Sequence, residues 1–428
     1  MRDLFFTLVL LAAIPIGLTT NYMALAFWYW IAFFQPHTQS FSFAMSVPFG
    51  QVAAGLALLS WMISKEKKLP PATPIVVLLV LLAVWVSITS LAAMFPSYAY
   101  VKWDLTVKVI LMALVGIAVM QSRERLNILI WAICLAIGYY GFKLGLFGLA
   151  GGGGSSYRGP SYMNENNGLA RAMIMFIPLL WYLVLQHKQT WVRAGLIAVG
   201  LSSCLALLFS GSRGAWIAAL AMAGFYGLRI KGGVFWMSIA GVLAVATIPL
   251  LPDHIVARFT SIGELGTDGS FQGRVEAWKF GFNLFLDRPI VGGGFGVFDY
   301  GHGRASHNSY FQMLGEHGGV GFILFISLLW YCASAMRWVR RMTKERPDLK
   351  WASQLALMLQ VILVGYCVGS LTINHAVFPL LYGIISIIAA LQIVVRRELA
   401  ASAAAAAPEM PADPSIGYVP SRGTGTAR

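Results

Sequence analysis

The sequence predicts an all-α polytopic membrane protein with about twelve transmembrane helices, one large extracytoplasmic loop subdomain and both termini in the cytoplasm. Its 428 residues are 58% hydrophobic and only 11% charged, whereas soluble domains carry roughly a quarter charged residues. Apolar stretches of about 20 residues, the length that a bilayer requires of a helix, recur along the whole chain. Short basic runs separate these stretches. Together these observations define the fold class.

The basic runs set the predicted orientation. The net charge is +14, but Lys and Arg gather between apolar stretches, for example at residues 65–68, 337–350 and 396–397. The positive-inside rule describes this pattern for cytoplasmic loops, so the charge argues against a nucleic-acid partner. The four cysteines lie inside predicted spans, so no disulfide framework is expected.

The elements alternate across the membrane in chain order. Residues 4–34, interrupted by Thr19, Thr20 and Asn21, are interpreted as one broken crossing, because the start of the chain is placed inside and residues 35–45 outside. The other spans are predicted at residues 46–64, 74–94, 103–121, 126–149, 168–186, 192–210, 214–229, 233–251, 318–338, 351–371 and 375–395. The chain thus divides into N-terminal transmembrane helices (1–251), an extracytoplasmic loop (252–317), C-terminal transmembrane helices (318–397) and a disordered cytoplasmic tail (398–428).

Four segments fall on the extracytoplasmic side, at residues 151–168, 210–214, 252–318 and 372–375. The third is long enough to form a subdomain, and connections of that length are usually functional. Within it, Val275, Trp278, Phe282 and Phe285 recur at helical spacing. This spacing predicts an amphipathic helix at residues 274–286 along the membrane surface.

Two arginines in these segments are candidate anion ligands. Arg213 lies in the turn after residue 210, against the positive-inside bias, and Arg274 opens the predicted amphipathic helix. Each guanidinium group can bind phosphate oxygens in a bidentate way, so two of them facing one pocket suit a diphosphate. The alternatives are an interfacial side chain that reaches lipid headgroups for Arg213 and a solvated helix-start charge for Arg274.

His307 is the candidate proton acceptor. It lies just before a predicted span, with Glu316 nine residues further along. A histidine with a near-neutral pKa can take the proton of an attacking hydroxyl. The alternative is an ordinary loop histidine, since the chain has seven histidines.

Further polar residues lie near the first extracytoplasmic segment. Asn164 or Asn167 is predicted to cap the helix that follows. Arg171 and Lys143, each about one turn inside a predicted span, are candidate phosphate ligands. The glycine run at 151–154 lacks the Gly-Lys-Ser/Thr of a nucleotide-binding loop, and no zinc-type His/Cys spacing occurs, so neither a metal nor a cofactor is expected.

Four short motifs follow one another on the extracytoplasmic side. They are Ser210-Gly-Ser-Arg-Gly214, Gly273-Arg-Val-Glu-Ala-Trp278, Pro289-Ile-Val-Gly-Gly-Gly-Phe-Gly296 and Ser306-His-Asn-Ser-Tyr-Phe-Gln-Met-Leu-Gly-Glu-His-Gly318. In this order they resemble the O-antigen ligase and O-antigen polymerase superfamily, and the resemblance covers nearly the whole chain except the tail. Residues 1–6, 35–37, 138–143 and 166–167 are similar to one subgroup, the O-glycosylation ligases associated with exosortase systems.

The resemblance implies an O-antigen ligase of the bacterial inner membrane with a periplasmic active site. It implies an inverting glycosyltransferase, independent of metal and nucleotide, that moves a glycan from undecaprenyl diphosphate to a hydroxyl of lipid A–core in lipopolysaccharide assembly. By motif position, Arg213 and Arg274 would bind the diphosphate and His307 would activate the acceptor hydroxyl. The resemblance implies a further cation, Arg171 or Lys143, and the supporting residues Asn167, Asn308 and Glu316.

Three other interpretations stay open. The same motifs fit an O-antigen polymerase, which extends another lipid-linked glycan, and a ligase that transfers the glycan to protein hydroxyls. A transporter or flippase for the lipid-linked glycan belongs to another class. Twelve crossings suit it, but the unusual polar residues gather at one face rather than between broken helices at the middle of the membrane.

Overall fold

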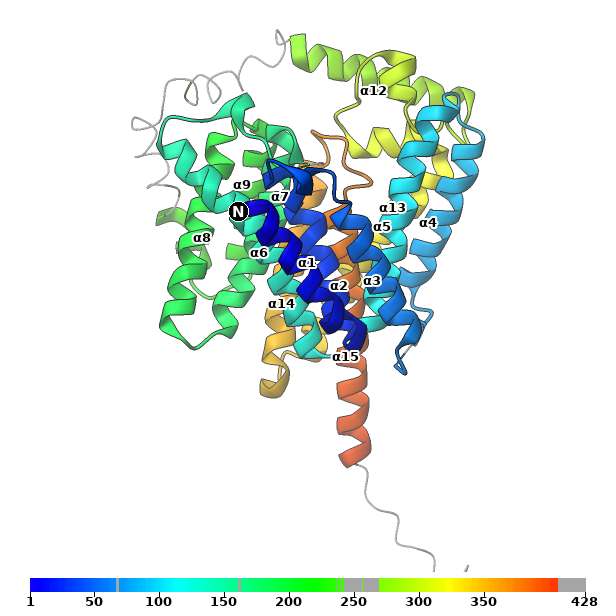
Figure 1. Ribbon diagram of the computed structural model, residues 1–428. Coiled ribbons are helices and arrows are strands. Elements are labelled where there is room, and N and C mark those ends of the chain that lie inside the picture. Colours follow the sequence, from blue (N-terminus) through cyan, green and yellow to red (C-terminus); the bar gives the residue numbers. More distant parts are fainter. Residues whose placement is uncertain are drawn as a thin grey trace, which may run out of the picture.

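The computed structural model describes residues 1–66, 69–160, 163–235 and 269–406, together with 237–239, 241 and 256. Every regular element in these ranges is a helix (Figure 1), which confirms the all-α class. The predicted span at 233–251 falls mostly outside the described residues. The first part of the long loop, most of residues 252–268, and the tail from residue 407 onward also lie outside them.

The main helices form one bundle (Figure 1). In chain order they are α1 (Arg2–Thr19), α2 (Asn21–Phe34), α3 (Phe49–Ile63), α4 (Pro74–Leu91), α5 (Pro96–Val119), α6 (Arg123–Leu149), α7 (Asn166–Gln186), α8 (Thr190–Phe209), α9 (Arg213–Gly227), α12 (Gly269–Asp287), α13 (Ser309–Met342), α14 (Lys350–Gly369) and α15 (Pro379–Ala406). Eight of the described helices are long and apolar enough to cross a membrane, namely α1, α4, α6, α7, α8, α13, α14 and α15. The chain is therefore a multi-pass membrane protein.

Helices α7 and α15 form the centre of the bundle. In their most apolar windows, 83% and 94% of the residues are buried, against 22% for α1. A helix that is hydrophobic on all sides is one that other helices surround. α15 packs on α5 and α13, and α7 packs on α8 and α14.

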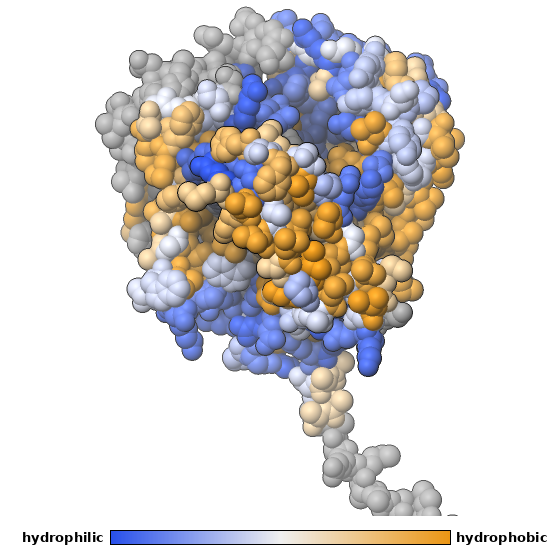
Figure 2. Space-filling model, viewed as in Figure 1, coloured by the Kyte–Doolittle hydropathy of each residue, from blue (hydrophilic) through white to orange (hydrophobic). Residues whose placement is uncertain are grey.

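The bundle has two polar ends. The end that carries the turns at residues 64–66, 120–122, 187–189, 228–232 and 343–349 is called the basic end here. The end that carries residues 35–48, 92–95, 150–160, 163–165, 210–212, 288–308 and 370–378 is called the loop end. Figure 2 shows hydrophilic surface toward both ends and a hydrophobic belt between them, as a bilayer requires.

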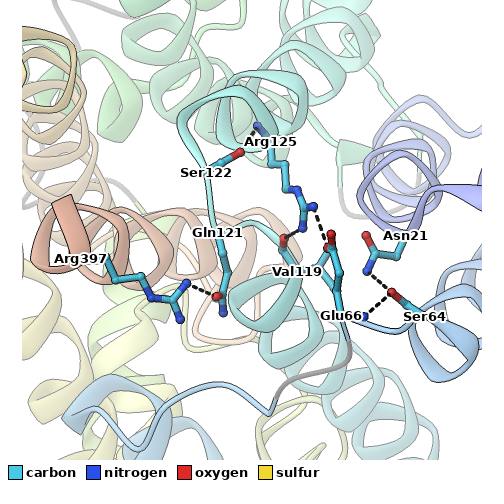
Figure 3. A network of polar contacts seen from close by, with 8 residues as sticks. All are labelled: Asn21, Ser64, Glu66, Val119, Gln121, Ser122, Arg125 and Arg397. Atoms are coloured by element: carbon cyan, nitrogen blue, oxygen red, sulfur yellow. Dashed lines mark hydrogen bonds and ion pairs between the residues drawn. The ribbon is translucent and has the colours of Figure 1, made fainter. Parts of the chain in front are cut away.

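A polar network ties helix ends together at the basic end (Figure 3). Arg125 donates hydrogen bonds to the Glu66 carboxylate at 2.7 Å and to the Val119 carbonyl at 3.1 Å. Asn21 Nδ2 donates to Ser64 Oγ at 3.1 Å. The turn between α1 and α2 is therefore fixed at the basic end.

Residues 2–34 form two antiparallel helices, so the single broken crossing expected from the sequence is wrong. The Asp3 carboxylate, at the start of α1, accepts hydrogen bonds from the backbone N–H groups of Ser42 and Ala44 at 2.9 and 3.3 Å. This contact holds the start of α1 at the loop end, whereas α15 ends at the basic end. The first and last helices therefore have their outer ends on opposite faces, in contrast to the prediction that both termini lie in the cytoplasm.

Two predicted boundaries also change. α15 continues to Ala406, so residues 398–406 are helical rather than the start of a disordered tail; alanine favours a helix, and Arg346 donates to Ser402 Oγ at 3.0 Å. α13 begins at Ser309, ahead of the predicted span at 318. A break at Gly318, where φ is 66°, divides it into a short first part and a long second part.

Candidate functional site

Segments that are far apart in the sequence meet at the loop end. Asn166 Nδ2 donates to the Ser210 carbonyl at 2.9 Å, which joins the first predicted extracytoplasmic segment to the second. Gly214 lies against the fourth segment, because a Cβ at this glycine would fall 2.1 Å from Thr372 Oγ1. The described parts of these segments thus share one end of the bundle, as the alternation of spans predicts.

The loop before α13 is locked to the turn between α14 and α15. The Ser309 amide donates to the Ser370 carbonyl at 2.8 Å. The Asn308 amide donates to Asn374 Oδ1 at 3.0 Å. Because Ser309 and Asn308 are both buried, these bonds fix the position of His307 immediately before them.

Asn308 has a structural role in this arrangement. Its Oδ1 accepts hydrogen bonds from the backbone N–H groups of Tyr310 and Phe311 at 2.9 and 3.2 Å. It therefore caps the N-terminus of α13, where the first N–H groups have no partner within the helix. Asn308 therefore fixes the start of α13 directly after His307.

Helix α12 brings Arg274 to His307. Trp278 Nε1 donates to the Ser306 carbonyl at 2.8 Å, and the indole stacks on Phe311 with ring centres 5.7 Å apart and 5° between the planes. Arg274 precedes Trp278 by one helical turn and lies on the same face of α12. The amphipathic helix predicted at 274–286 is thus confirmed as a helix, and its anchoring places the arginine at the loop.

His307 is held in an unusual backbone conformation. Its φ is 46°, and among the described non-glycine residues only Gln35 shares a positive φ. Such a conformation costs roughly 1–3 kcal/mol and persists where the surroundings determine it. The bonds on the following residues supply that constraint.

The charges around His307 favour its neutral form. Burial lowers the pKa of His307 below its ordinary value, the Arg274 cation lowers it further, and the Asp299 carboxylate raises it. An imidazole with a lowered pKa is uncharged at neutral pH and can accept a proton.

Arg213 lies where helix starts gather. It is the half-buried first residue of α9, and next to it Ser212 Oγ donates to Asn167 Oδ1 at 2.7 Å. The starts of α7 and α9 are therefore side by side, and α13 begins at the same end. Helix N-termini carry partial positive charge and bind phosphate groups, so this end of the bundle is suited to an anion.

Asn167 joins two helices and does not cap its own. The N-cap of α7 is Glu165, whose side chain makes no capping hydrogen bond. The prediction that Asn164 or Asn167 caps this helix is wrong, because the amide oxygen of Asn167 is used by Ser212. Asn167 therefore lies beside the start of α9, which carries Arg213.

Glu316 and the glycine motif form a scaffold beneath the loop. The Glu316 carboxylate accepts hydrogen bonds from the Gly296 amide at 3.4 Å and from Gln312 Nε2 at 3.0 Å. The Gly293 amide donates to the Gly315 carbonyl at 2.8 Å. These bonds pack the turn after α12 against the first part of α13, which fixes both elements that carry the site.

Arg171 lies below the site rather than in it. It is 3% exposed and donates hydrogen bonds to the Gly369 carbonyl and to Ser370 Oγ, the latter at 3.2 Å. Lys143 is exposed, with Nζ 5.9 Å from the centre of the Tyr139 ring. None of its described contacts is to the residues around His307.

Three charged residues of this region were not singled out from the sequence. The Asp299 carboxylate accepts a hydrogen bond from Tyr98 Oη at 3.2 Å, and Lys102 Nζ lies 5.7 Å from the centre of the Tyr98 ring. The Arg304 guanidinium lies where a Cβ at Gly273 would be. Residues 98 and 102 share a helix face, which is a weak signal, but no sequence pattern links them to residue 299.

The fold and the site define a multi-pass membrane protein with a cationic, histidine-containing site at one end. Among the described residues, no group of three His, Cys, Asp or Glu side chains is placed to hold a metal ion. Residues 196–326 match the family model of the O-antigen ligases, and residues 1–188 match a family of unknown function (DUF5935). The first match contains Arg213, Arg274 and His307, and it supports a relationship to the O-antigen ligase superfamily. No curated protein matches the chain.

Proposed function

We propose that this protein is an O-antigen ligase of the bacterial inner membrane. It transfers a glycan from undecaprenyl diphosphate to a hydroxyl of lipid A–core, with inversion and without metal or nucleotide. The observation that carries the proposal is the placement of His307 beside Arg274, in a loop bonded to the turn that meets the start of α9. The O-antigen ligase family match over the same residues supports it.

The orientation follows from the distribution of charge. Basic runs favour the cytoplasmic face of a membrane protein, so the basic end faces the cytoplasm and the loop end faces the periplasm. A lipid-linked donor can then keep its hydrocarbon chain in the membrane while its head reaches His307.

The transfer is a single displacement. The acceptor hydroxyl oxygen attacks the anomeric carbon while the bond from that carbon to the diphosphate oxygen breaks. The hydroxyl proton passes to the neutral imidazole of His307, and the bonding electron pair leaves with undecaprenyl diphosphate. One displacement inverts the configuration of the anomeric carbon.

The arginines act on the leaving group. Negative charge builds on the diphosphate oxygens as the bond breaks, so the fixed cations Arg213 and Arg274 stabilise the transition state more than the bound donor. The nearby helix N-termini add to this effect. Loss of one such contact is expected to lower the rate by about 100- to 1,000-fold.

A transfer assay tests the proposal. Purified protein in nanodiscs receives undecaprenyl-diphosphate glycan and lipid A–core, and wild type is compared with Arg213→Ala and with Arg193→Ala, an exposed arginine at the basic end. The expected result is a larger lipopolysaccharide product that Arg213→Ala loses and Arg193→Ala keeps.

Other products would replace the proposal with one of its alternatives. A lengthened lipid-linked glycan would identify a polymerase, which uses the same donor. Glycan on a serine- or threonine-containing peptide would identify a protein O-glycosylation ligase. Binding of the donor without a covalent product on any acceptor would instead favour a transporter.

A further inference from the structure

A groove on the membrane-facing part of the bundle runs toward the site. Helices α2, α3 and α5 line a volume of about 610 Å³. Most of its wall is apolar, with Trp28, Ile31, Leu58, Leu111 and Met112 among the lining residues. The groove therefore suits a hydrocarbon chain rather than a polar ligand.

The polar residues of the groove gather toward the loop end. Gln35 and His37 follow the last turn of α2, and Gln51 lies in the first turn of α3. Lys108, which also lines the groove, lies in the middle of α5 rather than at its loop end and is paired with Asp104 at 2.6 Å. Apart from this ion pair, the groove is polar toward the loop end and apolar toward the other end, as for a lipid with a polar head.

Two glycines keep one wall of the groove open. Gly50 and Gly55 of α3 both line it, and a Cβ at either position would meet no atom within 4 Å. Gly55 lies inside the helix, where glycine costs about 1 kcal/mol relative to alanine. Glycine at this position therefore lowers the stability of the helix, but it keeps the groove wider than a residue with a side chain would.

One face of α5 connects the groove to the site. Tyr98, Lys102, Leu105, Val109 and Met112 follow at alternating intervals of four and three residues, so they form one stripe. The last three line the groove, whereas the first two lie at the site. Along the axis of α5, Lys102 lies about 4.5 Å closer to the loop end than Leu105 does.

Lys102 places a positive charge at the end of this stripe. Burial, followed by the Arg171 and Lys102 cations, holds the pKa of His375 well below its ordinary value. Lys102 Nζ also lies 5.7 Å from the centre of the Tyr98 ring, and the Tyr98 hydroxyl donates to the Asp299 carboxylate of the site at 3.2 Å. A chain lying in the groove would have its head between this lysine and the cations of the site.

We infer that the groove between α2, α3 and α5 binds the isoprenoid chain of a polyprenyl-diphosphate donor, with Lys102 at its diphosphate. The inference rests on the proposed function and names where its donor lies. A second groove, of about 290 Å³ between α7, α8, α9 and α14, is lined by no charged residue. It lacks the polar end that a diphosphate lipid requires and serves as a comparison.

Filling the groove tests the inference. Gly55→Leu adds a side chain into open space and replaces a poor helix former, so folding is preserved. Ala223→Leu fills the second groove and is the matched control. Binding of undecaprenyl diphosphate and of geranyl diphosphate to each purified variant is measured by native mass spectrometry, together with phosphatidylglycerol.

The expected result is specific to the long chain. Gly55→Leu raises the Kd of undecaprenyl diphosphate by about tenfold or more, equivalent to about 1.4 kcal/mol, while the Kd of geranyl diphosphate changes little. Ala223→Leu leaves both unchanged. In the transfer assay, Gly55→Leu raises the donor KM and preserves kcat.

Two results would overturn the inference. One is wild-type affinity of Gly55→Leu for undecaprenyl diphosphate, and the other is an equal loss of phosphatidylglycerol binding, which marks an ordinary phospholipid groove. The binding measurement needs no glycan transfer. If the wild-type protein shows no transfer activity, the proposed ligase function is refuted. If Gly55→Leu nevertheless loses undecaprenyl-diphosphate binding, the assignment of the groove still holds.

Discussion

At the scale of single residues, the charges around His307 set the pH range in which it can act as a base. Burial and Arg274 lower its pKa from the ordinary 6.5, and Asp299 raises it. The base must be neutral, so kcat/KM for transfer is expected to fall only below about pH 6.5. The Asp299 anion stabilises the imidazolium, so Asp299→Asn is expected to shift this acid limb to lower pH.

Initial rates between about pH 5 and about pH 8, the range in which histidine titrates, measure the limb. Tyr98→Phe is the matched control, because it removes the hydrogen bond to Asp299 and keeps the carboxylate. The control is expected to move the limb much less. A limb that stays in place or moves upward in Asp299→Asn would contradict an action of this carboxylate on His307.

Arg171 is expected to position the site rather than bind the donor. Arg171→Met removes the two hydrogen bonds that the guanidinium group donates to the buried end of α14, and a hydrogen bond from a charged donor contributes about 1.5–3 kcal/mol. Thermal unfolding in detergent is expected at lower temperature, and kcat is expected to fall with the donor KM nearly unchanged. A raised donor KM at wild-type stability would instead make Arg171 a diphosphate ligand, as the family resemblance implies.

At the scale of elements, the packing of α13 on the glycine turn depends on Gly318. Its φ is 66°, and a Cβ there would lie 2.1 Å from the Ile290 carbonyl oxygen. Gly318→Ala must therefore displace the backbone beneath the loop that carries His307. We expect a loss of more than about 1 kcal/mol in unfolding free energy and a strong loss of transfer.

Unfolding in detergent compares this variant with Gly224→Ala. Gly224 lies inside α9, with no atom within 4 Å of an added Cβ. That substitution is expected to be neutral or stabilising by up to about 1 kcal/mol. Equal stability of the two variants would show that the contact with Ile290 does not constrain the turn.

Much of the element scale can be predicted from hydropathy. The span predicted at 74–94 corresponds to α4 and that at 126–149 to α6, because a bilayer demands long apolar helices whatever surrounds them. The α1–α2 pair could not be predicted in this way. Its orientation depends on Asp3 binding backbone N–H groups some 40 residues away, and no local pattern records that bond.

In the candidate site, too, sequence motifs predict some residues, whereas others are brought there only by tertiary packing. Arg213, Arg274 and His307 lie in sequence motifs and are found at the loop end. Asp299 and Lys102 carry no such motif, since their role arises from the packing of α5 against the turn at residues 297–302. Arg171 was expected to bind phosphate, but its burial against α14 cannot be read from its position one turn inside a span.

At the scale of the whole molecule, the site is a property of the bundle. Its residues come from α5, α7, α9, α12 and α13 and from the turn before α15, and the central helices α7 and α15 hold these elements at one end. Reaction at that end requires it to face the compartment that supplies the acceptor. The orientation of the chain therefore bears on both the fold and the proposed function.

Labelling of single cysteines in intact cells tests this orientation. In a background without the native cysteines, Ser46→Cys reports on the loop end and Glu345→Cys on the basic end; both positions are exposed. A membrane-impermeant reagent is expected to label Ser46→Cys in cells with a permeabilised outer membrane, and Glu345→Cys only after lysis.

A tag on the N-terminus is expected to be accessible together with Ser46→Cys, because Asp3 is bonded to Ser42 and Ala44. Accessible Ser46→Cys with a protected N-terminal tag would contradict the antiparallel α1–α2 pair. Labelling of Glu345→Cys from outside would place His307 in the cytoplasm, where it could not act on a periplasmic acceptor.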